Sequence, residues 1–396
     1  MEYMENEVKT LNRSLDANFL VSMMFDEPFR YRTHVEKIVS RNSKLSSRIR
    51  RELTAFAYGA FKWRDRLWDA KPENIDYDQV QSLIQEFQSE TLEQVREKIK
   101  ALSTIEEQAK YLSYPAWIIQ KWIEDFGFEK AIEIAWIQNQ NSDLCVRVNG
   151  ADESFEKAQK TFQSEGVETR RGKIPSAFYF LKKENVRGLQ AFKNGMFEVQ
   201  DEHSQQVCIW AEPKPYDFII DGCARTGGKA LHLAALQKDE GKILCMDIDA
   251  RVFNELDNRT RRLGIKSIQT RWIGRDDSNP APDMKEKADI VFVDAPCTGL
   301  GTIRHSPALK WNMQPESLPE FVQRQKEILE RQHRWVKKGG KLIYVTCSLL
   351  KEENEAVIEA FISRHPEFKI AKQERLFPVH QGGDGFYFCR MDKTSS

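Results

Sequence analysis

Two cysteines of this chain, Cys297 and Cys347, each lie just after an apolar segment that has the character of a buried strand. These segments are 290–293 and 341–345, and Asp294 opens the Asp-Ala-Pro-Cys sequence that ends at Cys297. In an open α/β sheet the carboxyl ends of the strands form the edge where ligands bind. Two thiols and a carboxylate at that edge indicate covalent catalysis rather than packing.

A glycine-rich turn follows the predicted strand 218–220 and leads into a predicted helix at 230–236. Such a turn lets the backbone approach a ligand closely at a helix N-terminus. It has neither the Gly-x-Gly-x-x-Gly spacing nor the Lys-Ser/Thr ending of a phosphate loop, so a nucleoside triphosphate is disfavoured.

Asp247 ends the next predicted strand, where a carboxylate can hydrogen-bond the two hydroxyls of a ribose. NAD and S-adenosylmethionine both fit this pattern, and a solvated aspartate after an ordinary turn is the alternative. The residues of this region predicted to bind the ligand are Cys223, Ala224, Arg225, Thr226, Gly227, Gly228, Lys229 and Asp247.

The hydrophobic patterns divide the 396 residues into three regions. Apolar residues recur at helical spacing from about residue 6 to 135, which predicts an all-helical region. Short strands and a helix over 140–205 indicate a small α+β module. From 213 to 390 apolar strands alternate with amphipathic helices, which predicts an α/β fold with a Rossmann-like, doubly wound, mostly parallel sheet. We expect domains at 1–138, 139–205 and 206–396.

Charge and cysteine content restrict the classes of function. The formal net charge is +0, so the chain carries no global signal for nucleic acid. Basic residues are nevertheless concentrated between Arg30 and Arg66, as RNA binding requires, although a solvated helix face would look the same. The seven cysteines include no Cys-x-x-Cys pair, so neither a disulfide framework nor a zinc site is indicated, and we expect no metal.

The chain also lacks the features of a membrane or secreted protein. No apolar stretch is long enough to span a bilayer, and the polar, acidic residues 1–5 are unlike a secretion signal. We therefore expect a cytoplasmic protein without a membrane partner.

Three long motifs resemble those of one known family. They are DAPCTGLGTIRHSPALKW from Asp294, TCSLLKEENE from Thr346 and CARTGGK from Cys223. They are similar to motifs of the RsmB/NOL1/NOP2/Sun (Fmu) family of RNA 5-methylcytosine methyltransferases. One departure is Arg225-Thr226, where the family usually has Ala-Pro, and we expect the loss of the proline to soften the turn. A second is the segment 272–277, which lacks the family's common Gly-Asp order. By the resemblance we assign the adenine side of the ligand to Asp276, and we expect Asp294 also to approach the ligand.

The resemblance extends over most of the chain. It covers the segment 197–204, the Arg147-Val148-Asn149 strand and the segment 384–387. The basic helix from Arg48 to Trp63 resembles the NusB-like domain that precedes the catalytic part in the bacterial RsmB branch of the family. The resemblance therefore implies an all-helical NusB-like domain, a small α+β module that is RRM-like, and a methyltransferase domain.

The resemblance implies that the chain methylates carbon 5 of a cytosine in RNA, with 16S ribosomal RNA favoured and S-adenosylmethionine as cofactor. It implies that Cys347 attacks the cytosine and forms a covalent adduct, that Cys297 helps to release the product, and that Asp294 contacts ring nitrogen 3. DNA cytosine methyltransferases instead use a Pro-Cys thiol after the fourth strand, which would make Cys297 the nucleophile. A transfer RNA methyltransferase and a non-catalytic, RNA-binding ribosome-assembly factor are the alternatives.

We expect the partner to be RNA and the chain to be monomeric. Lys229 and Lys310 are also candidates for orienting the thiols or neutralising a phosphate. The residues predicted to contact RNA are Arg48, Arg50, Arg51, Arg304, His305 and Lys310.

Overall fold

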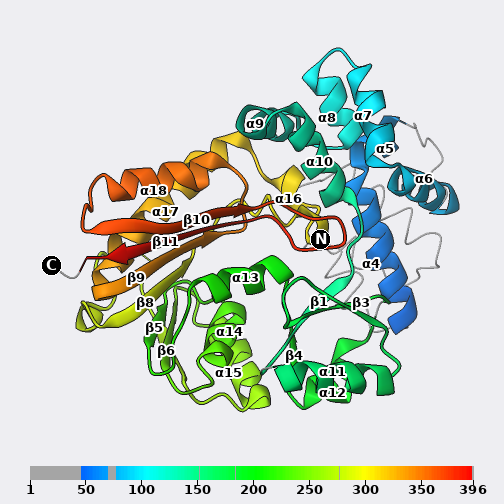
Figure 1. The fold of residues 1–396 in the computed structure, drawn as a ribbon. Helices are drawn as coiled ribbons and strands as arrows, with labels where there is room; N and C mark the ends of the chain where they lie inside the picture. Colours follow the sequence, from blue (N-terminus) through cyan, green and yellow to red (C-terminus); the bar gives the residue numbers. More distant parts are fainter. Residues whose placement is uncertain (1–45, 70–76, 151, 183, 276, 395–396) are drawn as a thin grey trace, which may run out of the picture. The chain divides into compact units, whose positions relative to one another are not determined.

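The computed structural model describes residues 46–69, 77–150, 152–182, 184–275 and 277–394 (Figure 1). The chain divides into two compact units. One unit comprises Met1–Asn141 together with Thr302–Ser317, and the other comprises Ser142–Gly301 together with Leu318–Ser396. The division into three domains with boundaries at 138 and 205 stays a prediction.

The described part of the first unit is helical. Its long stretch contains α4 (Ser47–Lys62), α5 (Arg64–Asp69), α6 (Tyr77–Ser89), α7 (Leu92–Lys100), α8 (Ile105–Leu112), α9 (Ala116–Phe126) and α10 (Phe128–Asn139). Thr91 and Thr104 form capping boxes at the start of α7 and α8. Gly127, with a φ of +82°, ends α9 and precedes α10. A NusB-like arrangement of these helices stays a prediction.

Residues 302–317 complete the core of this helical unit. They form η6 (Ile303–His305), α16 (Leu309–Asn312) and η7 (Pro315–Ser317). The Trp311 indole donates a hydrogen bond to Phe61 O over 2.9 Å, and Ile303 N donates to Gln138 Oε1 over the same distance. The second half of the motif that begins at Asp294 therefore belongs to the helical unit, which the sequence did not predict.

Lys310 is fully buried in the helical unit. Its Nζ donates to Lys62 O over 2.8 Å and to Asn139 Oδ1 over 3.0 Å, and it lies 3.9 Å from the centroid of the Tyr114 ring. Burial lowers the pKa of Lys310 well below its ordinary value. An Nζ group enclosed by these partners cannot contact a phosphate, so the prediction that Lys310 binds RNA is wrong.

The second unit contains a small module with a four-stranded antiparallel sheet in the order β2-β3-β1-β4. Its elements are β1 (Leu144–Val148), α11 (Asp152–Ser164), β2 (Thr169–Arg171), β3 (Ala177–Phe180), η4 (Val186–Gly188), α12 (Gln190–Lys193) and β4 (Phe197–Val199). The core is aromatic, because Phe162 lies edge-on to Phe178, Phe180 and Phe197. This packing holds α11 against the sheet.

A seven-stranded sheet in the order β10-β11-β9-β8-β5-β6-β7 forms the rest of the second unit. Its strands are β5 (Phe218–Asp221), β6 (Lys242–Asp247), β7 (Ile268–Trp272), β8 (Ala288–Asp294), β9 (Val336–Thr346), β10 (Phe368–Leu376) and β11 (Phe386–Lys393). β5 to β9 pair in parallel, whereas β11 is antiparallel to β9 and β10 is antiparallel to β11. The predicted α/β fold with a mostly parallel sheet is confirmed.

Helices cover both faces of this sheet (Figure 1). They are α13 (Glu202–Trp210), α14 (Gly228–Leu236), α15 (Val252–Leu263), α17 (Leu318–Gln332) and α18 (Glu355–Ile362), with short turns η5 (Pro282–Met284), η8 (His333–Trp335) and η9 (Lys351–Glu353). Ile220 and Val291 face α17 and α18, whereas Ile219 and Ile290 face α13 to α15, as the period of two in a strand requires. β5 pairs with both β6 and β8, so the strand order reverses there, and ligands bind at such a point.

Among the described helices none combines the length and the hydropathy that a membrane span requires.

The buried Lys62 of α4 predicts a pH dependence of stability. Its Nζ donates to Gln140 O over 3.0 Å, and burial, assisted by the charge of Arg304, lowers its pKa from 10.5 to about 7. Between these two pH values the unfolded chain binds more protons at this site than the folded chain, so stability rises with pH. From pH 7 to pH 9, we expect wild-type stability to gain on the order of 1–3 kcal/mol relative to Lys62→Met, measured by urea unfolding. The same change in the free energy of unfolding with pH in the two proteins would contradict this account.

Candidate active site

The two thiols lie at the carboxyl ends of neighbouring strands. Asp294, the last residue of β8, is paired with Val345 of β9 in parallel register, and the two segments continue to Cys297 and Cys347. The two Sγ atoms lie 3.4 Å apart. The structure thus brings together the two cysteines and places both just beyond strands whose ends meet at one edge.

Glu353 connects the loops that carry the two thiols. Its fully buried carboxylate accepts hydrogen bonds from Thr298 N over 2.8 Å, from Thr298 Oγ1 over 2.6 Å and from Gln325 Nε2 over 2.9 Å. Burial raises the pKa of Glu353, although these hydrogen bonds oppose the rise. The motif that includes Cys347 contains this glutamate, but the sequence did not predict that it connects the two loops, because Thr298 and Gln325 are distant from it in the chain.

The backbone around Cys347 is held from two sides. Asn354 accepts from Thr346 Oγ1 over 2.6 Å and donates to Ser348 O over 3.0 Å. Gly301 N donates to Cys347 O over 2.8 Å, and a Cβ added to Gly301 would lie 2.7 Å from that oxygen. Residue 301 must therefore be glycine for the loop after Cys297 to approach the loop of Cys347.

Lys229 and Asp294 form an ion pair at the same edge. Lys229 Nζ lies 2.6 Å from Asp294 Oδ2, and the two side chains are 13% and 24% exposed. Burial on its own lowers the pKa of Lys229, but the charge and hydrogen bond of Asp294 raise it above the ordinary value. Lys229 therefore stays protonated, and the pair links the glycine-rich turn to the end of β8.

The two thiols differ in acidity. A hydrogen bond from the Cys297 thiol lowers the pKa of Cys347, and the Lys229 ammonium acts in the same direction, against burial and the charge of Asp294. The same hydrogen bond, together with burial, raises the pKa of Cys297 well above its ordinary value. Cys347 is therefore the thiol that ionises more readily, and the thiolate is the nucleophilic form.

The glycine-rich turn joins β5 to α14 and is held by Asp247. The Asp247 carboxylate accepts hydrogen bonds from Arg225 N over 2.8 Å and from Asp249 N over 2.9 Å. Arg225 and Gly227 have left-handed backbones, with φ of +48° and +79°. A Cβ added to Gly227 would lie 2.2 Å from a methyl group of Leu256, so this position needs glycine both for its conformation and for space.

The surroundings of this turn fit an adenosyl ligand. Each oxygen of Asp247 accepts one backbone hydrogen bond and keeps a lone pair for a hydroxyl group. Ile248 and Trp272, at the ends of β6 and β7, are 42% and 60% exposed, and the Trp272 indole donates to Ile248 O over 3.1 Å. Exposed apolar side chains beside a carboxylate suit an adenine ring and its ribose. These two apolar residues were not predicted, because exposure at a sheet edge is not visible in the sequence.

Asp221 is a second carboxyl group that the sequence did not identify. It ends β5, directly before the turn, and is 1% exposed. Burial, followed by the charge of Asp294, raises its pKa to about 7. Cys223 N donates to Asp221 Oδ1 over 3.3 Å, so this group supports the start of the turn from within, next to the buried Ala224.

The remaining predicted residues are those expected to contact RNA or the adenine side of the ligand. The predicted residues whose side chains lie outside the described part of the chain are Arg48, Arg51 and Asp276. Arg50 is half-buried on α4, while Arg304 is buried and His305 exposed in η6 of the helical unit. Contact of these side chains with RNA stays a prediction.

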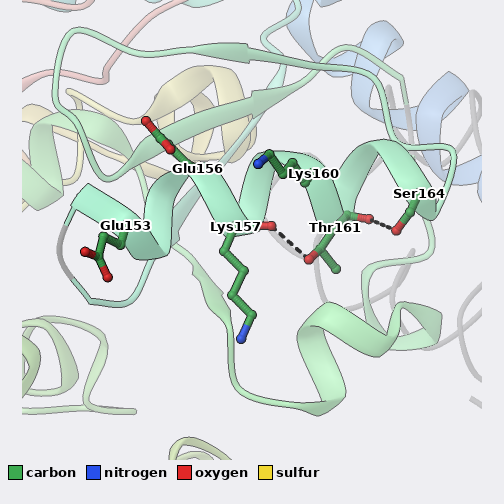
Figure 2. Close-up of a pocket in the computed structure, with 6 residues that line it drawn as sticks. All are labelled: Glu153, Glu156, Lys157, Lys160, Thr161 and Ser164. Atoms are coloured by element: carbon green, nitrogen blue, oxygen red, sulfur yellow. Dashed lines mark hydrogen bonds between the residues drawn. The ribbon is translucent and has the colours of Figure 1, made fainter.

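A hollow on the small module carries none of the predicted residues. It follows one face of α11 (Figure 2) and is lined by Glu153, Glu156, Lys157, Lys160, Thr161 and Ser164. The hydroxyls of Thr161 and Ser164 donate to carbonyl groups of their own helix, over 2.9 Å and 2.8 Å. This is the solvated face of a helix and offers no convergent groups for a ligand.

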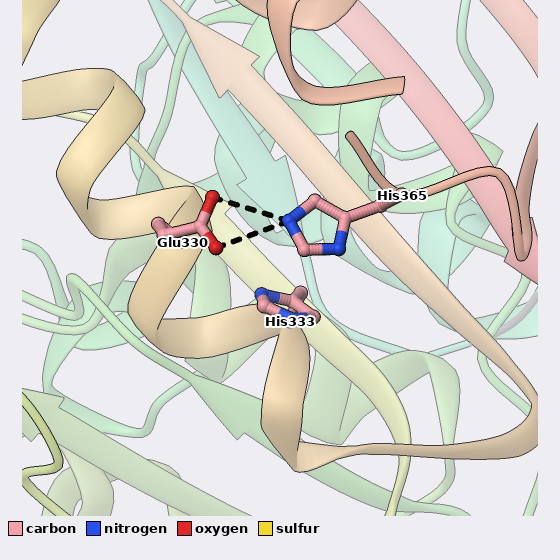
Figure 3. Close-up of side chains that lie close together, drawn as sticks. All are labelled: Glu330, His333 and His365. Carbon is pink, nitrogen blue, oxygen red and sulfur yellow. Dashed lines mark hydrogen bonds and ion pairs between the residues drawn. The ribbon is translucent and has the colours of Figure 1, made fainter. Parts of the chain in front are cut away.

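A cluster of ionisable side chains lies where α17 ends (Figure 3). His365 Nε2 lies 3.1 Å from Glu330 Oε2, and His365 Nδ1 lies 3.3 Å from Glu367 Oε1. The His333 ring is tilted by 45° against the His365 ring, with their centroids 4.1 Å apart. His333 precedes β9 and Cys347 follows it, so the cluster lies at the opposite end of that strand from the thiols.

Two family models and a curated relative match much of this chain. A family model described as 16S rRNA methyltransferase RsmB/F matches residues 208–392, and a model of an RsmF/B-like, ferredoxin-like domain matches residues 114–187. The probable ribosomal RNA small subunit methyltransferase B of Bacillus subtilis (strain 168) is 31% identical over 321 residues, which are 75% of this chain and 71% of that protein.

Two further matches extend the comparison. The ribosomal RNA small subunit methyltransferase B of Shigella boydii is 29% identical over 293 residues, which are 72% of this chain and 67% of that protein. Among solved structures, the crystal structure of PH0851 is 26% identical, with a TM-score of 0.77 over 97% of this chain and 99% of that chain. From the match to the Bacillus subtilis relative and the two family models, this chain belongs to the RsmB/F family of ribosomal RNA small subunit methyltransferases.

Proposed function

We propose that this protein methylates carbon 5 of a cytosine in 16S ribosomal RNA with S-adenosylmethionine as the methyl donor. The observation that carries the proposal is the 3.4 Å contact between the Cys297 and Cys347 thiols at the sheet edge that also holds the Lys229–Asp294 ion pair. Two thiols of unequal acidity suit a reaction that needs both attack and release. The names of the relatives support ribosomal RNA as the substrate.

The cofactor would lie against the glycine-rich turn. Asp247 would hold the ribose hydroxyls, Ile248 and Trp272 would flank the adenine, and Asp276 is proposed for its polar edge. The turn from Cys223 to Lys229 would face the rest of the ligand, with Asp294 nearby. When bound, S-adenosylmethionine supplies an electrophilic methyl group.

The chain's own residues activate the cytosine. Carbon 5 is a poor nucleophile until another group adds to carbon 6 of the ring. The Cys347 thiolate, which its lowered pKa favours, adds there and forms a covalent adduct. Asp294 contacts ring nitrogen 3, where negative charge develops, and a proton passed from the Lys229 ammonium through the Asp294 carboxyl group to that nitrogen neutralises the charge.

Release of the product breaks the bond between the Cys347 sulfur and carbon 6. After carbon 5 has gained its methyl group, a base removes the proton from that carbon and the Cys347 sulfur leaves carbon 6. Cys297 is kept protonated by its raised pKa, and its S–H group, which contacts the Cys347 sulfur, stabilises the departing thiolate.

RNA must present the cytosine to these groups. A base within a duplex or a tight loop has to leave its stack before a thiol can reach it. Arg48, Arg50 and Arg51 of α4, together with Arg304 and His305, are proposed to contact the surrounding phosphates. Lys310 is excluded from this set by its burial.

Substitution of the two thiols separates attack from release. Cys347→Ala is expected to form no covalent complex with 16S ribosomal RNA and to lower methylation on the order of a thousandfold or more. Cys297→Ala is expected to accumulate the complex, because the departing thiolate loses its hydrogen bond. Denaturing gels detect the complex, and bisulfite sequencing of the RNA locates the modified cytosine.

The control for this pair is Cys389→Ala, which removes a fully buried thiol of β11 and should leave methylation intact. Full methylation by Cys347→Ala with none by Cys297→Ala would mean that the two roles are reversed. If the wild-type protein modified transfer RNA alone, transfer RNA and not 16S ribosomal RNA would be its substrate. If it bound RNA but modified none, a non-catalytic assembly factor would be favoured.

Removal of the Asp247 carboxylate tests the proposed cofactor site. Asp247→Ala should weaken the binding of S-adenosylmethionine about tenfold to a hundredfold, because the ribose hydroxyls lose their acceptor and the turn loses its bond at Arg225 N. Isothermal titration calorimetry measures this change. Asp249→Ala is the matched control, since the Asp249 side chain pairs with Arg251 and not with the turn. Equal affinities in all three proteins would place the cofactor elsewhere.

A further inference from the structure

An arginine of α15 holds the outside of the glycine-rich turn. Arg259 Nη1 donates to Thr226 O over 2.7 Å and to Thr226 Oγ1 over 3.3 Å. Thr226 is exposed and lies between two residues with left-handed backbones, and it leaves φ free where a proline would restrict it. The shape of this exposed turn therefore depends on contacts from its surroundings, and Arg259 supplies one at its centre.

Glu198 of the small module fixes the guanidinium group of Arg259. Glu198 lies on β4 and is only 4% exposed. Its Oε2 accepts from Arg259 Nε over 3.2 Å and from Arg259 Nη2 over 2.8 Å. Because the guanidinium is a rigid plane, binding of one edge by the carboxylate directs Nη1 at the turn.

A neighbouring strand of the small module contacts the same turn. Arg147 of β1 is fully buried and lies opposite Glu198 in the antiparallel register. Arg147 Nη1 donates to Gln200 Oε1 over 2.6 Å and to Gly228 O over 3.4 Å. Two paired residues of the small sheet are thus connected to the two halves of the turn, one directly and one through Arg259.

We propose that Glu198 and Arg259 form a clamp that positions the glycine-rich turn, so that the small module is part of the S-adenosylmethionine site. The inference rests on the proposed function for the identity of the ligand. Glu198 and Arg259 act through the turn and are positioning residues. They set the fraction of molecules in which the turn has the conformation that binds the ligand. Loss of either residue lowers this fraction, and the affinity for the ligand falls by the same factor.

Calorimetric titration of S-adenosylmethionine into the full chain tests the clamp. Arg259→Ala and Glu198→Gln are each expected to bind it about tenfold more weakly, as for the loss of one charge-assisted contact. The KM for S-adenosylmethionine should rise by the same factor, while kcat at saturating cofactor stays at the wild-type value. Hydrogen exchange of the amides in residues 223–230 should be faster in both variants, and this readout needs no activity.

Arg262→Ala is the matched control. Arg262 also pairs with Glu198, but its Nη1 donates to carbonyl groups of the small module, Phe192 O over 2.8 Å and Phe197 O over 3.4 Å. This variant should unfold at a lower temperature and bind S-adenosylmethionine as wild type does, with unchanged exchange in the turn.

Wild-type affinity and exchange in Arg259→Ala would overturn the clamp, as would an equal loss of both in Arg262→Ala. A wild-type protein that binds no S-adenosylmethionine would instead contradict the proposed function. In that case the exchange of residues 223–230, compared between Arg259→Ala and Arg262→Ala, still decides whether the clamp holds the turn.

Discussion

The ion pair between Lys229 and Asp294 is the interaction on which the arrangement of the site depends. Its 2.6 Å contact joins Lys229, in the first turn of α14 directly after the glycine-rich turn, to the last residue of β8, across the point where the strand order reverses. A largely buried charge is stable only with a partner, so neither group can move without exposing the other to an unfavourable environment. The pair therefore fixes the distance between the turn proposed for the cofactor and the loop of Cys297. Its ammonium also favours the thiolate of Cys347.

The centre of the fold could be predicted from the sequence, and its edges could not. β5, β6, β8 and β9 are buried on both faces, so each is a nearly continuous apolar run with a clear boundary. β7 and β10 are the two outer strands of the sheet, and much of each is exposed. Their sequences, IQTRW and FKIAKQERL, are consequently rich in polar and charged residues and do not have the pattern of a buried strand.

The same distinction applies to the site. Cys297, Cys347 and Asp294 could be predicted because each directly follows or ends a central strand, so its position depends on local sequence. Glu353 was missed because its role depends on Thr298 and Gln325, which are distant in the chain. Lys310 was assigned wrongly for a related reason. A lysine within the motif that begins at Asp294 looks accessible in the sequence, and only the folded helical unit shows that Lys62 and Asn139 enclose it.

The unequal acidity of the two thiols is the central claim, and their rates of alkylation test it directly. Wild-type protein would be treated with iodoacetamide between about pH 6 and pH 9, and modification of the peptides containing Cys297 and Cys347 followed by mass spectrometry. Cys347 is predicted to react first near neutral pH and to reach its maximal rate at a lower pH than Cys297. A faster reaction of Cys297 at neutral pH, or a common titration of both thiols, would contradict the account.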